Sequence, residues 1–552
     1  MSSAYTALQL LAAGVVLSWC VSVRLPAQTP ASAWYLPSAD IAILLALFAL
    51  FGTRSRAWLR VSCAILLCVR LGRVADGVCQ RYFDRRFHVA ADLPLVPEFG
   101  RLALSTLGPL KLAGAVALLL VSTVLTWWLV RLSLDKLTRA LAEAQSGDRY
   151  MIAVAALALL GPVIAPRGSF YTSSVTPRLV SELEQWLTAR GLFDDPRRAE
   201  HRRQFAQRFE TGQKQLAEAA ALLPKNATTD VHLLLVEAYG RTVQTTPIYK
   251  EHLAASYQAF EAQVAAHGFK VCTDFVRATM LGGNSWLTHA TLQTGVPIFD
   301  QFDYGLVLEQ NPAASLAKAF GRAGYRTVSV KPGTTRYSPT ARIYGFDREY
   351  AARDLDYHGP SYAWAPMPDQ FVLQRIAEAE LRQPKQPLFI EYALVSSHFP
   401  FNPRPPYVED WASLGDGSLF HKLTALDWNN AKGGFFSQAL GYVDSLSYDL
   451  RVLGTFLSEH VHGDALVLIL GDHQPIAPIA GEDRSRFTPL HVLSRNDALL
   501  EPFRARGCLP GMMGRSSEPQ LIMEELGADL LRVLASAPQA GGGGGGGGGA
   551  AK

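Results

Sequence analysis

The chain has 552 residues, of which 49% are hydrophobic and 18% are charged, and its formal net charge is +4 at pH 7. This length allows two or more domains. The weak net charge and the absence of zinc-finger, helix-turn-helix and RNA-binding signatures argue against nucleic acid as a partner. The six cysteines form no CxxC pair and are scattered, so the sequence predicts no disulfide framework.

The apolar excess lies at the N-terminus, and we expect residues 1–166 to form a transmembrane domain. A membrane-spanning helix needs about 20 apolar residues to cross roughly 30 Å of hydrocarbon. Two of the five candidate spans are weaker, because the third contains two arginines and the fifth is short and contains a proline. The first candidate can alternatively be a signal peptide. The candidates are residues 5–23, 34–52, 57–71, 112–130 and 151–164.

Basic residues between the candidate spans predict the orientation of this domain. Arg54 and Arg56 follow the second span, and Arg131 and Lys136 follow the fourth. Loops rich in Lys and Arg stay in the cytoplasm, so the N-terminus is expected inside and everything after the fifth span outside. The basic loop 73–111 argues against this orientation unless it lies at the membrane surface.

Three further regions follow the spans. Residues 167–228 are expected to be a helical linker near the membrane surface, whose basic face can rest on anionic headgroups or be solvated. Residues 229–537 alternate strand-like and helix-like segments, which predicts an α/β domain. Residues 538–552 contain a glycine run and are expected to be a flexible tail.

The expected α/β domain has residues suited to chemistry at the ends of its strands. The last expected strand is continuously apolar, which is typical of a central strand in a parallel sheet covered on both faces. Ligands bind outside the carboxyl ends of such strands, and three of the four expected strands end at Glu237, at His398 and at the pair Asp472–His473. The expected strands are 231–240, 325–332, 387–398 and 465–473, and the expected helices are 314–324 and 436–460.

Each of these motifs has a functional and a structural interpretation. Imidazole plus carboxylate at Asp472 and His473 suits Zn²⁺ or Mn²⁺, although a polar turn ends a strand equally well. Glu237 and His398, taken singly, are more often structural residues. Two glycines precede Ser285, where a helix can begin, so its hydroxyl would lie where a phosphate is favoured. A simple N-cap, formed by Asn284 or by Ser285, is the alternative.

Taken in this order, Glu237, Ser285, the S-x-H-F-P-F motif at His398 and the G-D-H motif resemble the sulfatase-like branch of the alkaline phosphatase superfamily. The motifs are most similar to those of the lipoteichoic acid synthases and the membrane phosphoethanolamine and phosphoglycerol transferases. The resemblance covers essentially the whole chain and is most specific over residues 231–500. It implies about five N-terminal spans and an alkaline-phosphatase-like domain on the periplasmic side of the bacterial inner membrane. The C-x-P-x-R signature of formylglycine sulfatases is absent, which argues against sulfate ester hydrolysis.

The resemblance also implies a metal centre. Glu237, Asp472 and His473 match the metal ligands of the family, and Ser285 matches the nucleophile that also contacts the metal. Thr288 is the rival nucleophile, one turn further into the presumed helix. The implied cofactor is a divalent cation, Zn²⁺ or Mn²⁺.

Two histidines complete the expected site. His398 matches a residue that binds the transferred phosphate or protonates the leaving group, and His491 is expected to support the ligands or bind a second metal. The implied activity is transfer of a phosphoethanolamine or phosphoglycerol headgroup from a membrane phospholipid, through a phosphoseryl intermediate, to an envelope glycan or lipid. A sulfatase or phosphodiesterase acting at the same site, or a catalytically silent membrane sensor, are the alternatives.

Overall fold

The structure is a computed structural model of the chain. It describes residues 56–83, 87, 89–143, 145–158, 196–225, 228–335, 339–427, 435–481, 483, 485–515 and 521–536, and a few residues before 56. The chain divides into two compact units, Met1–Pro196 and Arg197–Lys552, and each is considered separately.

The described part of the first unit is helical. Among the described helices, the stretch Pro109–Ala142 of α5 is the one that is long and apolar enough to cross a membrane, by length and composition. It contains the expected fourth span, whereas the third falls in α3, which also carries Arg60, Arg70 and Asp76. The first two expected spans lie largely outside the described residues, so the five-span domain is not confirmed. The helices are α3 (Arg56–Phe83), α4 (Val89–Asp92), η2 (Leu93–Leu95), α5 (Val96–Glu143) and α6 (Ser146–Ala158).

The second unit is built on one nine-stranded sheet with the order β4-β3-β5-β1-β6-β7-β2-β8, and β9 pairs with β2. β1 pairs in parallel with both β5 and β6, whereas β7 is antiparallel to β6 and β2. The sheet is therefore mixed, and β6 has only one parallel neighbour. The strands are β1 (Asp230–Val236), β2 (Lys270–Arg277), β3 (Arg326–Lys331), β4 (Arg348–Ala351), β5 (Leu388–Ala393), β6 (Ala465–Gly471), β7 (Phe487–Ser494), β8 (Leu509–Pro510) and β9 (Leu521–Ile522).

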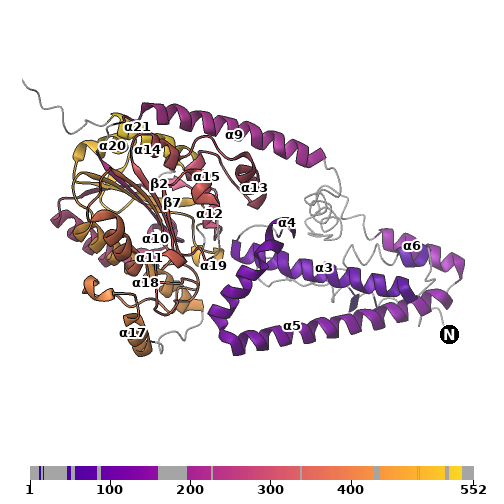
Figure 1. Ribbon diagram of the computed structural model, residues 1–552. Coiled ribbons are helices and arrows are strands. Elements are labelled where there is room, and N and C mark those ends of the chain that lie inside the picture. Colours follow the sequence, from indigo (N-terminus) through magenta and orange to yellow (C-terminus); the bar gives the residue numbers. More distant parts are fainter. Residues whose placement is uncertain are drawn as a thin grey trace, which may run out of the picture. The chain divides into compact units, whose positions relative to one another are not determined.

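Helices cover both faces of this sheet (Figure 1). α11 (Pro247–Ala266), α16 (Asp369–Ile376) and α18 (Phe435–Glu459) share one hydrophobic cluster with alternate strand residues such as Leu234 and Ile390. On the opposite face, the intervening strand residues, such as Leu233 and Phe389, share a second cluster with four helices. Both faces are buried, which explains the continuous apolar run of β6. The four helices are α9 (Pro196–Leu222), α12 (Ser285–Thr294), α14 (Leu316–Arg322) and α21 (Met523–Ser536).

The remaining elements connect these layers. α9 falls in the range expected to be a linker, and its Arg208 and Gln213 side chains bind backbone carbonyls at Pro297 and Thr294, beside α12. The shorter elements are α10 (Thr242–Thr245), α13 (Gln301–Gln310), α15 (Thr340–Tyr344), η3 (Ala352–Asp354), η4 (Ala377–Leu381), η5 (Trp411–Leu414), α17 (Leu419–Asp427), α19 (Ala477–Ala480), η7 (Asp497–Leu499) and α20 (Glu501–Ala505).

A disulfide links two segments that are distant in the sequence. Cys272 in β2 bonds to Cys508, which precedes β8, and their Cα atoms lie 5.5 Å apart. The spacing of the cysteines in the sequence left this pairing open, because only the sheet brings the two residues together.

Candidate active site

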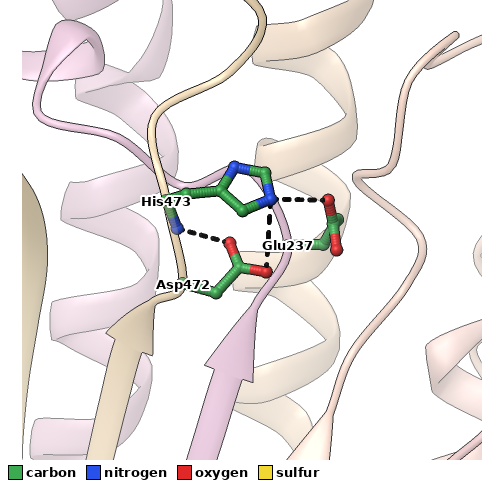
Figure 2. A group of neighbouring side chains, drawn as sticks. All are labelled: Glu237, Asp472 and His473. Atoms are coloured by element: carbon green, nitrogen blue, oxygen red, sulfur yellow. Dashed lines mark hydrogen bonds and ion pairs between the residues drawn. The ribbon is translucent and has the colours of Figure 1, made fainter. Parts of the chain in front are cut away.

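Three side chains meet where β1 and β6 end. The two strands are paired so that Val236 lies beside Gly471, and the residues that follow each strand therefore become neighbours. Figure 2 shows Glu237, Asp472 and His473 grouped at this edge. One ligand atom from each lies within 4.8 Å of the others, and all three are buried. Nε2 of His473 is 3.3 Å from Glu237 Oε1 and 3.7 Å from Asp472 Oδ2.

The glycine of the G-D-H motif is required by backbone packing. A Cβ atom at Gly471 would lie 1.8 Å from the carbonyl oxygen of Tyr239, in the loop after β1. The same loop is tied to β6, because the Ala238 amide donates to Asp472 Oδ1 at 2.8 Å. Ala238 itself has a φ of 56°, in the left-handed region that is unfavourable for alanine. The close approach of the two strand ends therefore depends on the absence of a side chain at position 471.

Gly471→Ala is expected to destabilise the second unit by about 3 kcal/mol, because overpacking against a backbone carbonyl cannot be relieved by a rotamer change. The measurement is thermal unfolding of the full chain. Gly305→Ala is the matched control: Gly305 lies in α13 with nothing within 4 Å of its would-be Cβ, so alanine there should be neutral or slightly stabilising. Equal melting temperatures for Gly471→Ala and the unmodified chain would contradict the prediction.

The imidazole of His473 is held with one nitrogen toward the carboxylates. Its Nδ1 donates to the backbone carbonyl of Gln474 at 2.7 Å, so Nε2 is the nitrogen that faces Glu237 and Asp472. This is how metal-binding histidines are usually fixed. The Asp472 carboxylate is fixed as well, because its Oδ1 accepts from the His473 amide at 2.7 Å.

The electrostatics of the group favour a cation. Burial and the Glu237 charge raise the pKa of Asp472 to about 8. Burial lowers the pKa of His473, but the two carboxylates outweigh it and raise that pKa to about 9. Glu237 keeps its charge, because His398 and His473 hold its pKa well below its usual range despite burial. The buried carboxylates thus attract positive charge, and a donor set of two carboxylates and one imidazole nitrogen fits a divalent metal such as Zn²⁺ or Mn²⁺.

Ser285 reaches this group from the first residue of α12. The preceding residues 282–284 all have positive φ, which folds the loop sharply enough to present the hydroxyl at the strand ends. The Ser285 hydroxyl donates to Glu237 Oε2 at 2.7 Å and lies 3.2 Å from His473 Nε2. The helix N-cap is Asn284, as one form of the alternative interpretation expects, but its side chain makes no capping hydrogen bond, and Ser285 is the first helical residue. Thr288 is fully buried, and its hydroxyl has no hydrogen-bond partner among the described residues.

His398 follows β5 on a loop that Asp369 holds in place. The Asp369 carboxylate accepts from the Val395 amide at 3.0 Å and from the Ser396 amide at 2.7 Å. His398 Nδ1 donates to the Phe399 carbonyl at 2.5 Å, and Nε2 has no hydrogen bond to any residue that the structure describes. Burial lowers the pKa of His398, and the charge of Glu237 opposes this effect. Sequence reasoning gave Asp369 no role in the site, because its partners are backbone amides that only the fold brings near.

His491 in β7 lies outside the metal-capable group found among the described residues. Its Nδ1 lies 2.7 Å from Thr273 Oγ1 and its Nε2 lies 2.9 Å from the Tyr239 hydroxyl. Tyr239 comes two residues after Glu237, so this network supports the loop that carries a ligand. Both ring nitrogens are engaged, and the structure therefore gives no reason to assign His491 a second metal.

Comparison with known proteins finds one family model that is similar to this part of the chain. The family model described as Sulfatase matches residues 230–487, a range that includes Glu237, Ser285, His398 and the pair Asp472–His473. No curated protein sequence matches the chain significantly.

Several solved structures are similar at low identity. The lipoteichoic acid synthase LtaP from Listeria monocytogenes is 13% identical, with 57% of this chain and 75% of that chain covered and a TM-score of 0.35. The Streptococcus pyogenes phosphoglycerol transferase GacH is 14% identical, with 60% and 82% covered and a TM-score of 0.36. The soluble domain of lipooligosaccharide phosphoethanolamine transferase A from Neisseria meningitidis is 13% identical, with 56% and 94% covered and a TM-score of 0.36. The Sulfatase family model thus matches the part of the chain that contains the ordered motifs, in agreement with the resemblance that those motifs predict.

Proposed function

We propose that this chain is a metal-dependent membrane phosphotransferase that moves a phosphoethanolamine or phosphoglycerol headgroup from a phospholipid to an envelope glycan or lipid. The observation that carries the proposal is the position of the Ser285 hydroxyl, 2.7 Å from Glu237 and 3.2 Å from His473. A hydroxyl in a buried group of metal-binding donors is a typical activated nucleophile. Glu237, Asp472 and His473 would hold the ion, Zn²⁺ or Mn²⁺.

When bound, the cation would lower the pKa of the Ser285 hydroxyl and balance charge on the phosphate oxygens. The Ser285 proton is lost to solvent, because Glu237, whose pKa is held well below its usual range, stays charged. The Ser285 oxygen then bonds to phosphorus, the bond from phosphorus to the diacylglycerol oxygen breaks, and His398 Nε2 protonates that oxygen. A bound phosphodiester anion near His398 would favour its protonated form.

The resulting phosphoseryl group carries the headgroup. An acceptor hydroxyl attacks its phosphorus and gives its proton to His398 Nε2, while the serine oxygen leaves in the ionised form that begins the next cycle. Water in place of the acceptor would make the same site a phosphodiesterase. The serine hydroxyl and three metal-binding donors gathered in one place argue against a silent sensor, which would have no need of them.

The proposal is tested with the full chain purified in detergent with Zn²⁺ or Mn²⁺ and given phosphatidylethanolamine or phosphatidylglycerol. Diacylglycerol release should be accelerated by added lipid or glycan acceptor, and mass spectrometry should find the headgroup phosphate on the acceptor. Release at the same rate into water alone, with no acceptor product, would identify a hydrolase. No release from either lipid with any acceptor would overturn both readings.

His398→Ala is expected to slow headgroup transfer by about 100-fold, the usual scale for loss of a general acid. The hydrogen bond from Nδ1 to the Phe399 carbonyl leaves Nε2 available to act as the acid, which supports this role. The variant is assayed by diacylglycerol release and by thermal unfolding. His252→Ala is the control, because His252 pairs with Asp444 on the surface. If His398→Ala unfolds the domain while His252→Ala does not, His398 is structural.

We further propose that this chain is a bacterial inner-membrane protein and that its α/β domain lies on the periplasmic side. The Cys272–Cys508 bond supports this location, because disulfides persist in oxidising compartments. A reporter active only in the periplasm, fused after Lys552, should therefore be active, whereas the same reporter placed between Arg131 and Arg149 should be inactive. Activity in the reverse pattern would reject the orientation, and with it access to envelope acceptors.

A further inference from the structure

A tryptophan stacks on His398, the candidate general acid. The indole of Trp364 stacks on the imidazole of His398, with ring centroids 4.0 Å apart and planes inclined by 16°. Trp364 comes from the segment between η3 and α16, thirty-four positions before His398 in the chain. The two rings meet because the fold brings this segment beside the loop that follows β5.

The position of Trp364 is defined by a tight turn. Tyr362 and Ala365 exchange two backbone hydrogen bonds of 2.9 Å, which leaves Ala363 and Trp364 at the tip. Ala363 has a φ of 50°, the left-handed conformation that two-residue turns of this kind require. Tyr362 is 2% exposed and belongs to the hydrophobic cluster beneath the sheet. The turn is therefore anchored in the core and presents the indole from a fixed point.

The indole also contacts the backbone beyond β3. A Cβ atom placed on Gly333 would lie 3.0 Å from Cη2 and 3.1 Å from Cζ3 of Trp364. The absence of a side chain at Gly333 thus leaves room for the ring. Trp364 contacts the chain after β3 at one edge and His398 on one face.

The stacked indole limits how far the imidazole ring of His398 can tilt. The imidazole is only partly buried, and the hydrogen bond from Nδ1 to the Phe399 carbonyl fixes which nitrogen is free without preventing the ring from tilting. A flat ring at van der Waals distance opposes that tilt. Proton transfer needs its donor held within about 0.5 Å of the productive position.

We infer that Trp364 is a positioning residue: its indole holds the His398 imidazole with Nε2 directed at the leaving oxygen of the lipid donor and shields that ring from water. This role rests on the proposed transferase function. The effect of the indole on the exposure of the His398 ring, however, can be measured without turnover.

The first experiment measures the accessibility of His398 in the full chain by diethylpyrocarbonate labelling and peptide mass spectrometry. Trp364→Ala should raise the labelling rate of His398 several-fold, and Trp364→Phe, which keeps a ring in place, should restore the slow rate. His252, 43% exposed on its side chain, serves as the internal reference and should not change. Equal His398 labelling in Trp364→Ala and the unmodified chain would overturn the inference, whatever the enzyme's activity.

The second experiment is a double-mutant cycle on headgroup transfer. Trp364→Ala should lower kcat by roughly 10-fold or more, because a misplaced catalytic group loses its orientation, while KM for the donor changes little. Trp364→Phe should recover most of kcat. In a His398→Ala background, Trp364→Ala should cost nothing further. An equal loss in both backgrounds would show that Trp364 acts independently of His398 and would overturn the inference.

The two experiments separate the possible failures. If the unmodified chain transfers no headgroup but Trp364→Ala exposes His398, the proposed function is wrong and the restraint on the ring stands. If transfer occurs and neither labelling nor the cycle connects the two residues, the function stands and the role of Trp364 is wrong.

Discussion

Ser285→Ala is expected to reduce headgroup transfer by about 10⁴-fold or more, the scale on which loss of a nucleophile disables an enzyme. The reason is geometric: among the described hydroxyls, that of Ser285 is hydrogen-bonded to both Glu237 and His473. With donor lipid and no acceptor, the intact chain should accumulate an adduct. The peptide containing Ser285 should then gain the mass of the headgroup phosphate, and Ser285→Ala should show no such gain.

Two variants act as controls for this result. Ser285→Thr keeps a hydroxyl at the same backbone position and should retain measurable adduct. Thr288→Ala removes a fully buried hydroxyl one turn further along α12 and should leave the adduct detectable. Near-normal transfer by Ser285→Ala, or a label that maps to Thr288, would show that the nucleophile has been assigned wrongly.

Asp472→Asn is expected to weaken metal binding by more than about 100-fold, beyond the usual effect of changing a residue that only supports a ligand, and to remove most activity. The substitution has nearly the same shape, and the remaining Oδ1 can still accept from the Ala238 and His473 amides. The fold should therefore survive. The changed atom is Oδ2, the one that lies 3.7 Å from His473 Nε2.

Metal content of the purified full chain, measured by mass spectrometry after dialysis, checks this prediction together with thermal unfolding. Asp483→Asn is the matched control, because Asp483 is a largely buried carboxylate that pairs with Arg241 outside the metal-capable group. It should keep its metal. Normal metal content in Asp472→Asn would remove Asp472 from the ligand set.

The strands that could be expected from the sequence are those with continuous or nearly continuous apolar runs. Strands β1, β3, β5 and β6 are covered on both faces. Strands buried in this way are mostly apolar, so their composition indicates that they are buried. The sequence pattern does not predict β2 and β7, and the reason is physical. Asp274 interrupts β2 and is stabilised by Arg515 at 2.7 Å, and β7 contains Pro489, a residue that normally argues against a strand.

The sequence by itself predicted which strand-end residues form the metal-capable group, because Glu237, Asp472 and His473 follow apolar runs typical of buried strands and match the ordered motifs of a known family. It also placed Ser285 at a helix start, because two glycines precede it. The tertiary structure decided the rest. The pairing of β1 with β6 sets the distances within the metal-capable group, and the folding of separate loops brings Asp369 and Trp364 to the segment around His398. Contacts of this kind join residues far apart in the chain through backbone amides and ring faces, which leave no pattern in a single sequence.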